Sequence, residues 1–123
     1  MRDLGAAERL HLEHRDVGGV RACLRIAEDI GLPVVVSSAL ETSVGIAAGV
    51  ALAAALPDLR FACGLATVQL LADDVVAESL LPVDGALPVS RPEVHADALG
   101  RTAAAPDRER HWRDRFAAVG SRA

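Results

Sequence analysis

Apolar and polar positions in the first half of the chain predict helices that alternate with short buried strands. Residues 34–37 begin with three valines, an apolar run typical of a strand that is buried on both faces. Before this run, apolar residues recur at helical spacing over residues 20–30, and charged residues fall on the opposite side. Gly31 is a usual helix terminator, and Pro33 prevents continuation. The pattern predicts an amphipathic helix that packs on one side of a sheet.

A second helix is predicted directly after the valine run. Residues 43–56 are apolar on all sides, which indicates a helix that is buried on most faces. Thr42 or Ser43 can cap its first turn. Gly45 and Gly49 are small enough to let this helix lie close to its neighbouring strand.

Residues 59–63 predict a second short strand, which ends at Gly64. Thr67 could cap a short helix that runs to Leu71. Helix and strand in alternation favour parallel pairing with right-handed crossovers, so the fold class is α/β.

The N-terminal segment, residues 1–16, has the weakest pattern. One face of a short helix could be formed by Leu4, Ala7, Leu10 and His11. Residues 11–16 are too charged for a buried strand, and a solvated surface segment is expected instead. His11 and His14 have no acidic or thiol ligand placed convincingly with them, so no metal site is expected there.

The C-terminal half predicts turns, edges and one helix. Asp73 and Asp74 could pair at a metal, but surface solvation is favoured because adjacent side chains point in different directions. Residues 80–89 predict two extended pieces around an Asp-Gly turn. Residues 103–105 predict a linker, and residues 106–119 predict a docking helix or a frayed end with Trp112 and Phe116 on one face.

Composition narrows the function classes. The 123 residues suffice for one domain, and 51% hydrophobic with 24% charged residues is typical of a globular chain. A net charge of -4 without a basic face argues against a nucleic-acid partner. The sequence contains no lysine, which excludes Schiff-base chemistry and a lysine base within this chain. Two separated cysteines favour reduced thiols in the cytoplasm, and no apolar stretch approaches the roughly 20 residues of a membrane span.

Candidate chemistry gathers where the predicted strands hand over to helices, which is where parallel α/β folds place their sites. The first junction carries the polar residues Ser37, Ser38, Glu41, Thr42 and Ser43. The second junction begins at Gly64 and Leu65, where the glycine either lets the backbone approach a ligand or simply makes a strand-to-helix turn.

Three stretches, residues 18–21, 36–45 and 62–67, resemble the o-succinylbenzoate synthase family of the enolase superfamily, most closely its actinobacterial branch. Their order and spacing agree with that family of menaquinone-biosynthesis enzymes. The resemblance implies the last helix–strand units of a (β/α)8 barrel, followed by a short extended return segment and a C-terminal helix. It divides the chain into residues 1–17, unmatched; residues 18–100, a partial barrel; and residues 101–123, a tail rich in Ala and Arg.

The family's reaction is a dehydration in which a lysine removes a proton and magnesium, held by three carboxylates, stabilises the enediolate. By this resemblance, two loops line the substrate pocket, and their residues here are Ser37, Ser38, Glu41, Gly64 and Leu65. Hydroxyls and amides at a helix start would suit a substrate carboxylate.

The family's lysines and metal ligands have no counterpart here, and Glu13 stands where the sixth-strand lysine is expected. We therefore expect no catalytic residue and no bound magnesium in this chain alone, and a small carboxylate substrate only in a completed barrel. Two alternatives stay open. The chain could be a non-catalytic half-barrel that associates with itself or with a separately encoded remainder. It could also be a free-standing carboxylate-binding protein, which would need a closed pocket.

Overall fold

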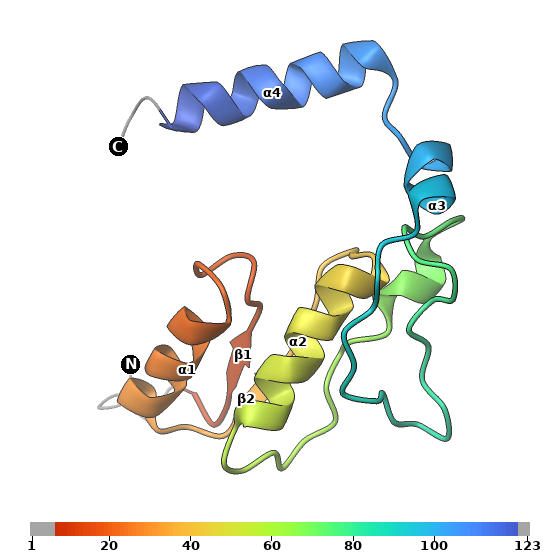
Figure 1. Ribbon diagram of the computed structural model, residues 1–123. Helices are drawn as coiled ribbons and strands as arrows, with labels where there is room; N and C mark the ends of the chain where they lie inside the picture. The colour runs from red at the N-terminus through yellow and green to blue at the C-terminus, as the bar shows by residue number, and fades with distance from the viewer. Residues whose placement is uncertain (1–6, 121–123) are drawn as a thin grey trace.

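The computed structural model describes residues 7–120 and has α/β architecture (Figure 1). Its elements in chain order are β1 (Leu10–Leu12), α1 (Val20–Ile30), β2 (Val34–Val36), α2 (Ser43–Ala55), the 3₁₀ helix η2 (Thr67–Leu70), α3 (Ala96–Arg101) and α4 (Pro106–Gly120). β1 and β2 pair in parallel, with Leu10 opposite Val34 and Leu12 opposite Val36. None of the helices within residues 7–120 is both long enough and apolar enough to cross a bilayer.

The helix–strand–helix unit predicted from periodicity is confirmed. In α1 the charged side faces solvent, whereas Cys23 is fully buried. Gly31 ends α1 in the left-handed region with φ 63°, a conformation that glycine adopts without steric cost. β2 is buried along its whole length, as expected for three valines between α-helical and sheet neighbours.

The prediction of a solvated segment without a strand at residues 11–16 is wrong at its start, because Leu10–Leu12 form β1. The strand is only three residues long, and its exposed His11 lies between the two leucines. Successive side chains of a strand point to opposite faces, so Leu12 is buried while His11 faces outward. The charged residues 13–16 begin only after the strand ends. Ala7 and Leu10 are not helical. Leu4, the first residue of the helix considered there, lies outside the described residues.

The strand predicted at residues 59–63 is also wrong. Only Gly64 joins the sheet, through a single parallel bridge to Ser37 on the side of β2 opposite β1. The Gly64 amide donates to the Val36 carbonyl at 2.9 Å, and the Ser38 amide donates to the Gly64 carbonyl at 3.0 Å. Residues 59–62 are exposed, so burial does not hold them in a regular strand.

Helix α2 is the centre of the core and packs against α1, β2 and η2. Ile46 and Leu52 are fully buried. A Cβ placed on Gly49 would lie 2.7 Å from a terminal methyl of Leu65, so the missing side chain makes room for that leucine. The expected role of Gly49 in close packing is therefore confirmed. Its neighbour, however, is Leu65 in the loop after Gly64 rather than a regular strand.

The C-terminal half contains the predicted turn and terminal helix. Val83 and Ala86 exchange backbone hydrogen bonds of 2.9 and 3.0 Å around Asp84 and Gly85, whose φ angles are 50° and 79°. α3 follows, an element that the sequence analysis did not predict. α4 lies apart from the α1–β2–α2 unit in Figure 1, and residues 106–119 within it are all exposed.

Candidate functional site

The two predicted loops meet at one edge of the sheet, which we call the rim and define as Ser37, Ser38, Glu41 and Gly64. Ser37 and Gly64 face each other in the parallel bridge. Both residues lie at the carboxyl ends of neighbouring strand segments, and parallel α/β folds carry their chemistry there. The rim therefore has the location that the sequence analysis predicted.

Hydroxyl groups tie the rim together. The Ser38 hydroxyl donates to the Gly64 carbonyl at 3.0 Å and lies 3.0 Å from the hydroxyl of Thr67. Thr67 in turn donates to the Ala39 carbonyl at 2.5 Å. Thr67 is the first residue of η2 and does not cap it, so the predicted capping role is wrong. Its hydroxyl instead links the two loops, a role that only the tertiary contact reveals.

Leu65 and Gly64 contribute to the site in different ways. Gly64 is exposed, whereas Leu65 is buried in the core against Gly49. The Leu65 side chain therefore anchors the loop after Gly64 in the core. At Gly64 itself the loop exposes backbone.

Glu13 reaches the rim from the end of β1. Its Oε1 accepts a hydrogen bond of 2.9 Å from the amide of Ala39, in the loop after β2. Arg15 places a guanidinium nitrogen 3.8 Å from the same oxygen. A carboxylate thus occupies the position at which the family resemblance places a lysine, and it is held there by the β2 loop.

Glu41 and His14 form the most buried polar pair at the rim. Glu41 Oε1 lies 3.7 Å from His14 Nε2, and the two side chains retain 8% and 13% of their exposure. Glu41 Oε2 and His14 Nδ1 are buried and have no hydrogen-bond partner in the described part of the chain. The sequence analysis singled out Glu41 but treated His14 as part of a solvated segment.

Asp74 corrects the expectation of a solvated aspartate pair. Its side chain is buried, with 5% exposure for the residue, and it accepts hydrogen bonds from the amide and the hydroxyl of Ser43. The Ser43 hydroxyl also accepts from the amide of Leu80 at 2.7 Å. Asp73, by contrast, is exposed and pairs with Arg101 at 3.2 Å.

Asp74 also replaces the side-chain cap that was expected at α2. Thr42 is the N-cap residue of α2, but its side chain makes no capping hydrogen bond. A carboxylate near a helix N-terminus is favoured by the free amides and the helix dipole. Burial alone would raise the pKa of Asp74, but hydrogen bonds from Ser43, Ser79 and Val75 outweigh it and lower that pKa. The chain's own carboxylate therefore binds one amide at the start of α2, whereas the sequence analysis expected the amides at a helix start to suit a substrate carboxylate.

The possible metal ligands and the two cysteines do not form a reactive site in the described part of the chain. Within residues 7–120, no three His, Cys, Asp or Glu side chains come close enough to hold a metal ion. The residues present thus do not fit the magnesium site that the family resemblance implies. Cys23 and Cys63 are free, and burial raises the pKa of the Cys23 thiol, which makes it a poor nucleophile.

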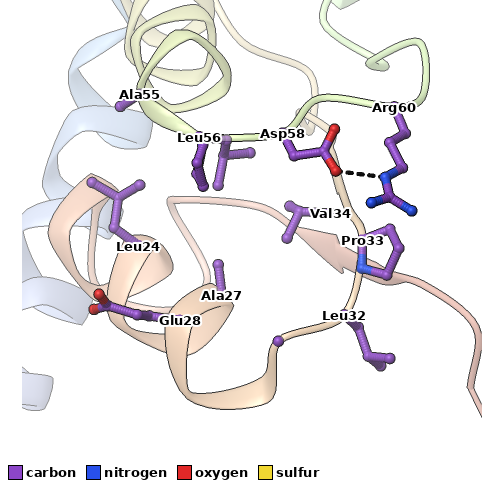
Figure 2. A pocket seen from close by; sticks show the side chains of 12 residues that line it. Leu24, Ala27, Glu28, Leu32, Pro33, Val34, Ala55, Leu56, Asp58 and Arg60 are labelled. Carbon is purple, nitrogen blue, oxygen red and sulfur yellow. Dashed lines mark hydrogen bonds and ion pairs between the residues drawn. The ribbon is translucent and has the colours of Figure 1, made fainter.

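A cavity of about 540 Å³ lies at the other end of β2, between the C-terminal ends of α1 and α2 (Figure 2). Its apolar lining includes Leu24, Ala27, Pro33, Val34 and Leu56. Asp58 and Arg60 pair at 2.5 Å beside it. Because Val34 begins β2 and Ser37 follows its end, this cavity is separate from the rim.

Parallel strands joined by a crossover helix, with a polar rim at their carboxyl ends, place the chain among the parallel α/β folds. The chain belongs to the enolase C-terminal domain-like family, whose model matches residues 1–93. The match includes residues 1–17, which the sequence analysis set apart from the family.

Curated relatives are named o-succinylbenzoate synthase, as the resemblance suggested. The relative from Thermobifida fusca is 56% identical over 119 residues, which are 97% of this chain and 37% of the relative. The relative from Mycobacterium ulcerans is 51% identical over 114 residues, which are 93% of this chain and 35% of the relative. The chain thus spans about a third of the length of the curated relatives it matches.

Solved structures agree with the barrel assignment. The muconate lactonizing enzyme from Pseudomonas putida superposes with a TM-score of 0.73 and 28% identity, covering 84% of this chain and 31% of that enzyme. A probable mandelate racemase from Alicyclobacillus acidocaldarius superposes with a TM-score of 0.70 and 30% identity, covering 85% of this chain and 30% of that protein. The chain therefore resembles about a third of each barrel enzyme.

Proposed function

We propose that this chain is the C-terminal part of an o-succinylbenzoate synthase-type barrel and supplies one wall of its substrate pocket. The reaction would be the dehydration of 2-succinyl-6-hydroxy-2,4-cyclohexadiene-1-carboxylate to o-succinylbenzoate. The observation that carries the proposal is the meeting of Ser37 and Ser38 with Gly64 at one rim. The names of the curated relatives support the choice of reaction.

In this proposal the chain binds and orients substrate but does not complete the chemistry alone. Ser38 and the exposed backbone of Gly64 would contact the substrate, and Glu41 would face it from the start of α2. The lysines that move the proton, and the carboxylates that would hold magnesium, belong to the other strands of a complete barrel. The two free cysteines favour a reducing compartment, which supports the cytoplasm as the site of action.

The test is a turnover assay on the purified chain. We expect no o-succinylbenzoate from the cyclohexadiene substrate, even with excess magnesium, because a positioned general base contributes roughly 10² to 10⁴ in rate. Addition of a purified fragment carrying the remaining two thirds of the Thermobifida fusca relative should produce a complex on size-exclusion chromatography. Turnover by the isolated chain that disappears in Glu41→Ala would contradict the proposal.

The second candidate is a non-catalytic half-barrel that associates with itself. A short two-stranded sheet leaves edges open, and the helix α4 exposes Trp112 and Phe116 by 54% and 83%. Sedimentation equilibrium of the chain alone separates the two candidates. A stable dimer that does not dissociate when the barrel fragment is added favours the second, and a monomer that binds the fragment favours the first.

A further inference from the structure

The cavity at the start of β2 lies at the end of the sheet opposite the rim and takes no part in the proposed function. Its volume of about 540 Å³ falls within the roughly 300–1,000 Å³ that small-molecule pockets have in proteins. The end of α1, the turn into β2 and the segment after α2 surround it (Figure 2). A ligand bound in this cavity would therefore leave the rim free.

The wall of the cavity is apolar. Leu24 and Ala27 contribute to it from α1, Leu56 from the end of α2, and Val34 from the start of β2 (Figure 2). The residues that line it include no aromatic side chain. Such a wall favours the hydrocarbon part of a ligand, because binding removes apolar surface from water.

Negative charge gathers around the cavity. The helices α1 and α2 both end at it, and a helix C-terminus carries the equivalent of about half a negative charge. Neither helix has a basic residue in its last turn to offset that charge. α1 instead carries Glu28 there, an exposed residue that lines the cavity and has no ion-pair partner within residues 7–120.

Arg60 does not neutralise this charge. Its Nε lies 2.5 Å from Oδ2 of Asp58, which also lines the cavity. Figure 2 shows the two side chains paired at one side of the cavity. Because this pair is neutral as a whole, Glu28 and the two helix ends leave an uncompensated negative charge beside an apolar wall.

We propose that this cavity binds a small aliphatic ammonium ion. Its hydrocarbon chain lies against Leu24, Val34 and Leu56, and its nitrogen lies at the mouth of the cavity near Glu28. The last carbonyl groups of a helix have no partner within the helix, so they can accept hydrogen bonds from the ammonium. Glu28 determines specificity, because a neutral ligand of the same length loses its attraction and an anionic one is repelled.

The first experiment titrates the full 123-residue chain with hexylammonium, 1-hexanol and hexanoate, which share a hydrocarbon chain and differ in charge. Methyl ¹H–¹³C spectra report binding at Leu24, Val34 and Leu56, and Leu70, an exposed residue of η2, is the reference. We expect saturable shifts at the three lining residues only. Hexylammonium should bind about two- to fivefold more tightly than hexanol, with hexanoate the weakest.

Three results of this titration would overturn the proposal. They are equal affinities for the amine and the alcohol, no saturable shift with millimolar amine, and shifts at Leu70 as large as those at the lining residues.

A matched pair of variants tests the role of Glu28. Glu28→Gln removes a charge that lines the cavity, whereas Asp29→Asn removes a neighbouring exposed charge that does not line it. Glu28→Gln should remove most of the preference for hexylammonium over hexanol, and Asp29→Asn should retain it. Equal effects of the two changes would contradict a specific role for Glu28.

A second pair tests the location of the hydrocarbon chain. Ala55→Leu adds bulk at the cavity wall, and Ala54→Leu adds the same bulk at an exposed neighbouring position that does not line it. Ala55→Leu should weaken the binding of hexylammonium and hexanol alike, and Ala54→Leu should weaken neither. Unchanged binding in Ala55→Leu would place the ligand elsewhere and refute the proposed site.

The competing occupant is the apolar face of α4 from a second copy of the chain, with Trp112 exposed by 54%. If α4 fills the cavity, Trp112→Ala shifts the methyl signals of Leu56 in the absence of amine. That result would also overturn the proposal, and we expect the signals to stay in place.

Discussion

At the scale of single residues, Asp74 shows how one buried carboxylate organises a loop. It accepts from the Ser43 amide at 3.2 Å and from the Ser43 hydroxyl, and thereby attaches the segment after η2 to the start of α2. Because the Ser43 hydroxyl also accepts from the Leu80 amide, two distant parts of the chain depend on the same contact.

Replacing this carboxylate should destabilise the fold. Asp74→Asn replaces one carboxylate oxygen by an amide donor that faces the Ser43 hydroxyl, and a buried hydrogen bond to a charged group contributes about 1.5–3 kcal/mol. We expect the free energy of unfolding in urea to fall by about that amount. Glu93→Gln, an exposed acid-to-amide change, is the matched control and should leave the unfolding midpoint unchanged.

The same residue should make stability depend on pH in the acid range. The folded-state pKa of Asp74 is lowered by its hydrogen bonds, so its stabilisation is complete above the ordinary value of about 3.9. As the pH falls from there through the folded pKa, the carboxylate is protonated and that contribution is lost. We expect urea unfolding at a series of acid pH values to show that the free energy of unfolding falls more steeply with pH for the unmodified chain than for Asp74→Asn. Parallel curves for the two proteins would contradict this assignment.

The roles of individual polar residues could be predicted only in part from the sequence. Ser37, Ser38 and Glu41 were singled out because they follow a clear buried strand, and the structure places Ser37 and Ser38 beside Gly64. Asp74 and His14 were not, because the partner of Asp74 lies 31 residues away and the partner of His14 lies in the loop after β2. A solvated side chain and a buried, paired one have the same local sequence pattern.

At the scale of secondary structure elements, the packing of α2 against the loop after Gly64 depends on one missing side chain. Gly49 leaves room for Leu65, whereas Gly100 in α3 has no heavy atom near the position of a Cβ. Both glycines lie in helices, so alanine at Gly100 is a control for the effect of alanine at Gly49 without a packing contact.

Alanine at these two positions should have opposite effects. Gly100→Ala should stabilise the chain by about 0.5–1 kcal/mol, because alanine loses less backbone entropy in a helix. Gly49→Ala has the same entropic advantage, but it forces Leu65 to move within the core. Overpacking of this kind costs about 1–3 kcal/mol. Thermal unfolding of both variants should rank Gly100→Ala above the unmodified chain and Gly49→Ala below it. A more stable Gly49→Ala would show that Leu65 moves without cost.

Elements with a strong local periodicity were predicted well, and short strands were not. The residues of α1, β2 and α2 carry apolar patterns long enough to specify them, with Gly31 marking one boundary. β1 has three residues, and the partner at Gly64 has one. Such short extended segments are decided by what they pair with, because their local preference is small compared with the tertiary contacts.

At the scale of the whole molecule, the carboxylate of Glu13 has consequences for a completed barrel. The family resemblance places a lysine at this position, and Glu13 instead accepts a hydrogen bond from Ala39. The proposed substrate is an anion, so a carboxylate on this edge of the rim would repel it.

Glu13→Lys should therefore raise turnover when the chain is combined with the Thermobifida fusca barrel fragment. A lysine at this position replaces a repelling carboxylate by a cation that attracts the anionic substrate. The same change removes the acceptor for the Ala39 amide, so we expect a modest loss of stability, about 1–3 kcal/mol. Product formation and urea unfolding, measured on the same preparation, check both effects. Glu8→Lys, an exposed change of equal charge, is the control for a general effect on the net charge.

The sequence by itself determined the α/β class, the α1–β2–α2 unit and the place of the rim, because these follow from local periodicity and from glycine and proline at the boundaries. Only the tertiary structure decided that β1 exists, that Asp74 caps α2, and that His14 faces Glu41. The physical reason is the same in each case. Burial and hydrogen bonding between distant residues outweigh local preference, so a charged side chain such as that of Asp74 is buried where the fold supplies hydrogen-bond donors for it.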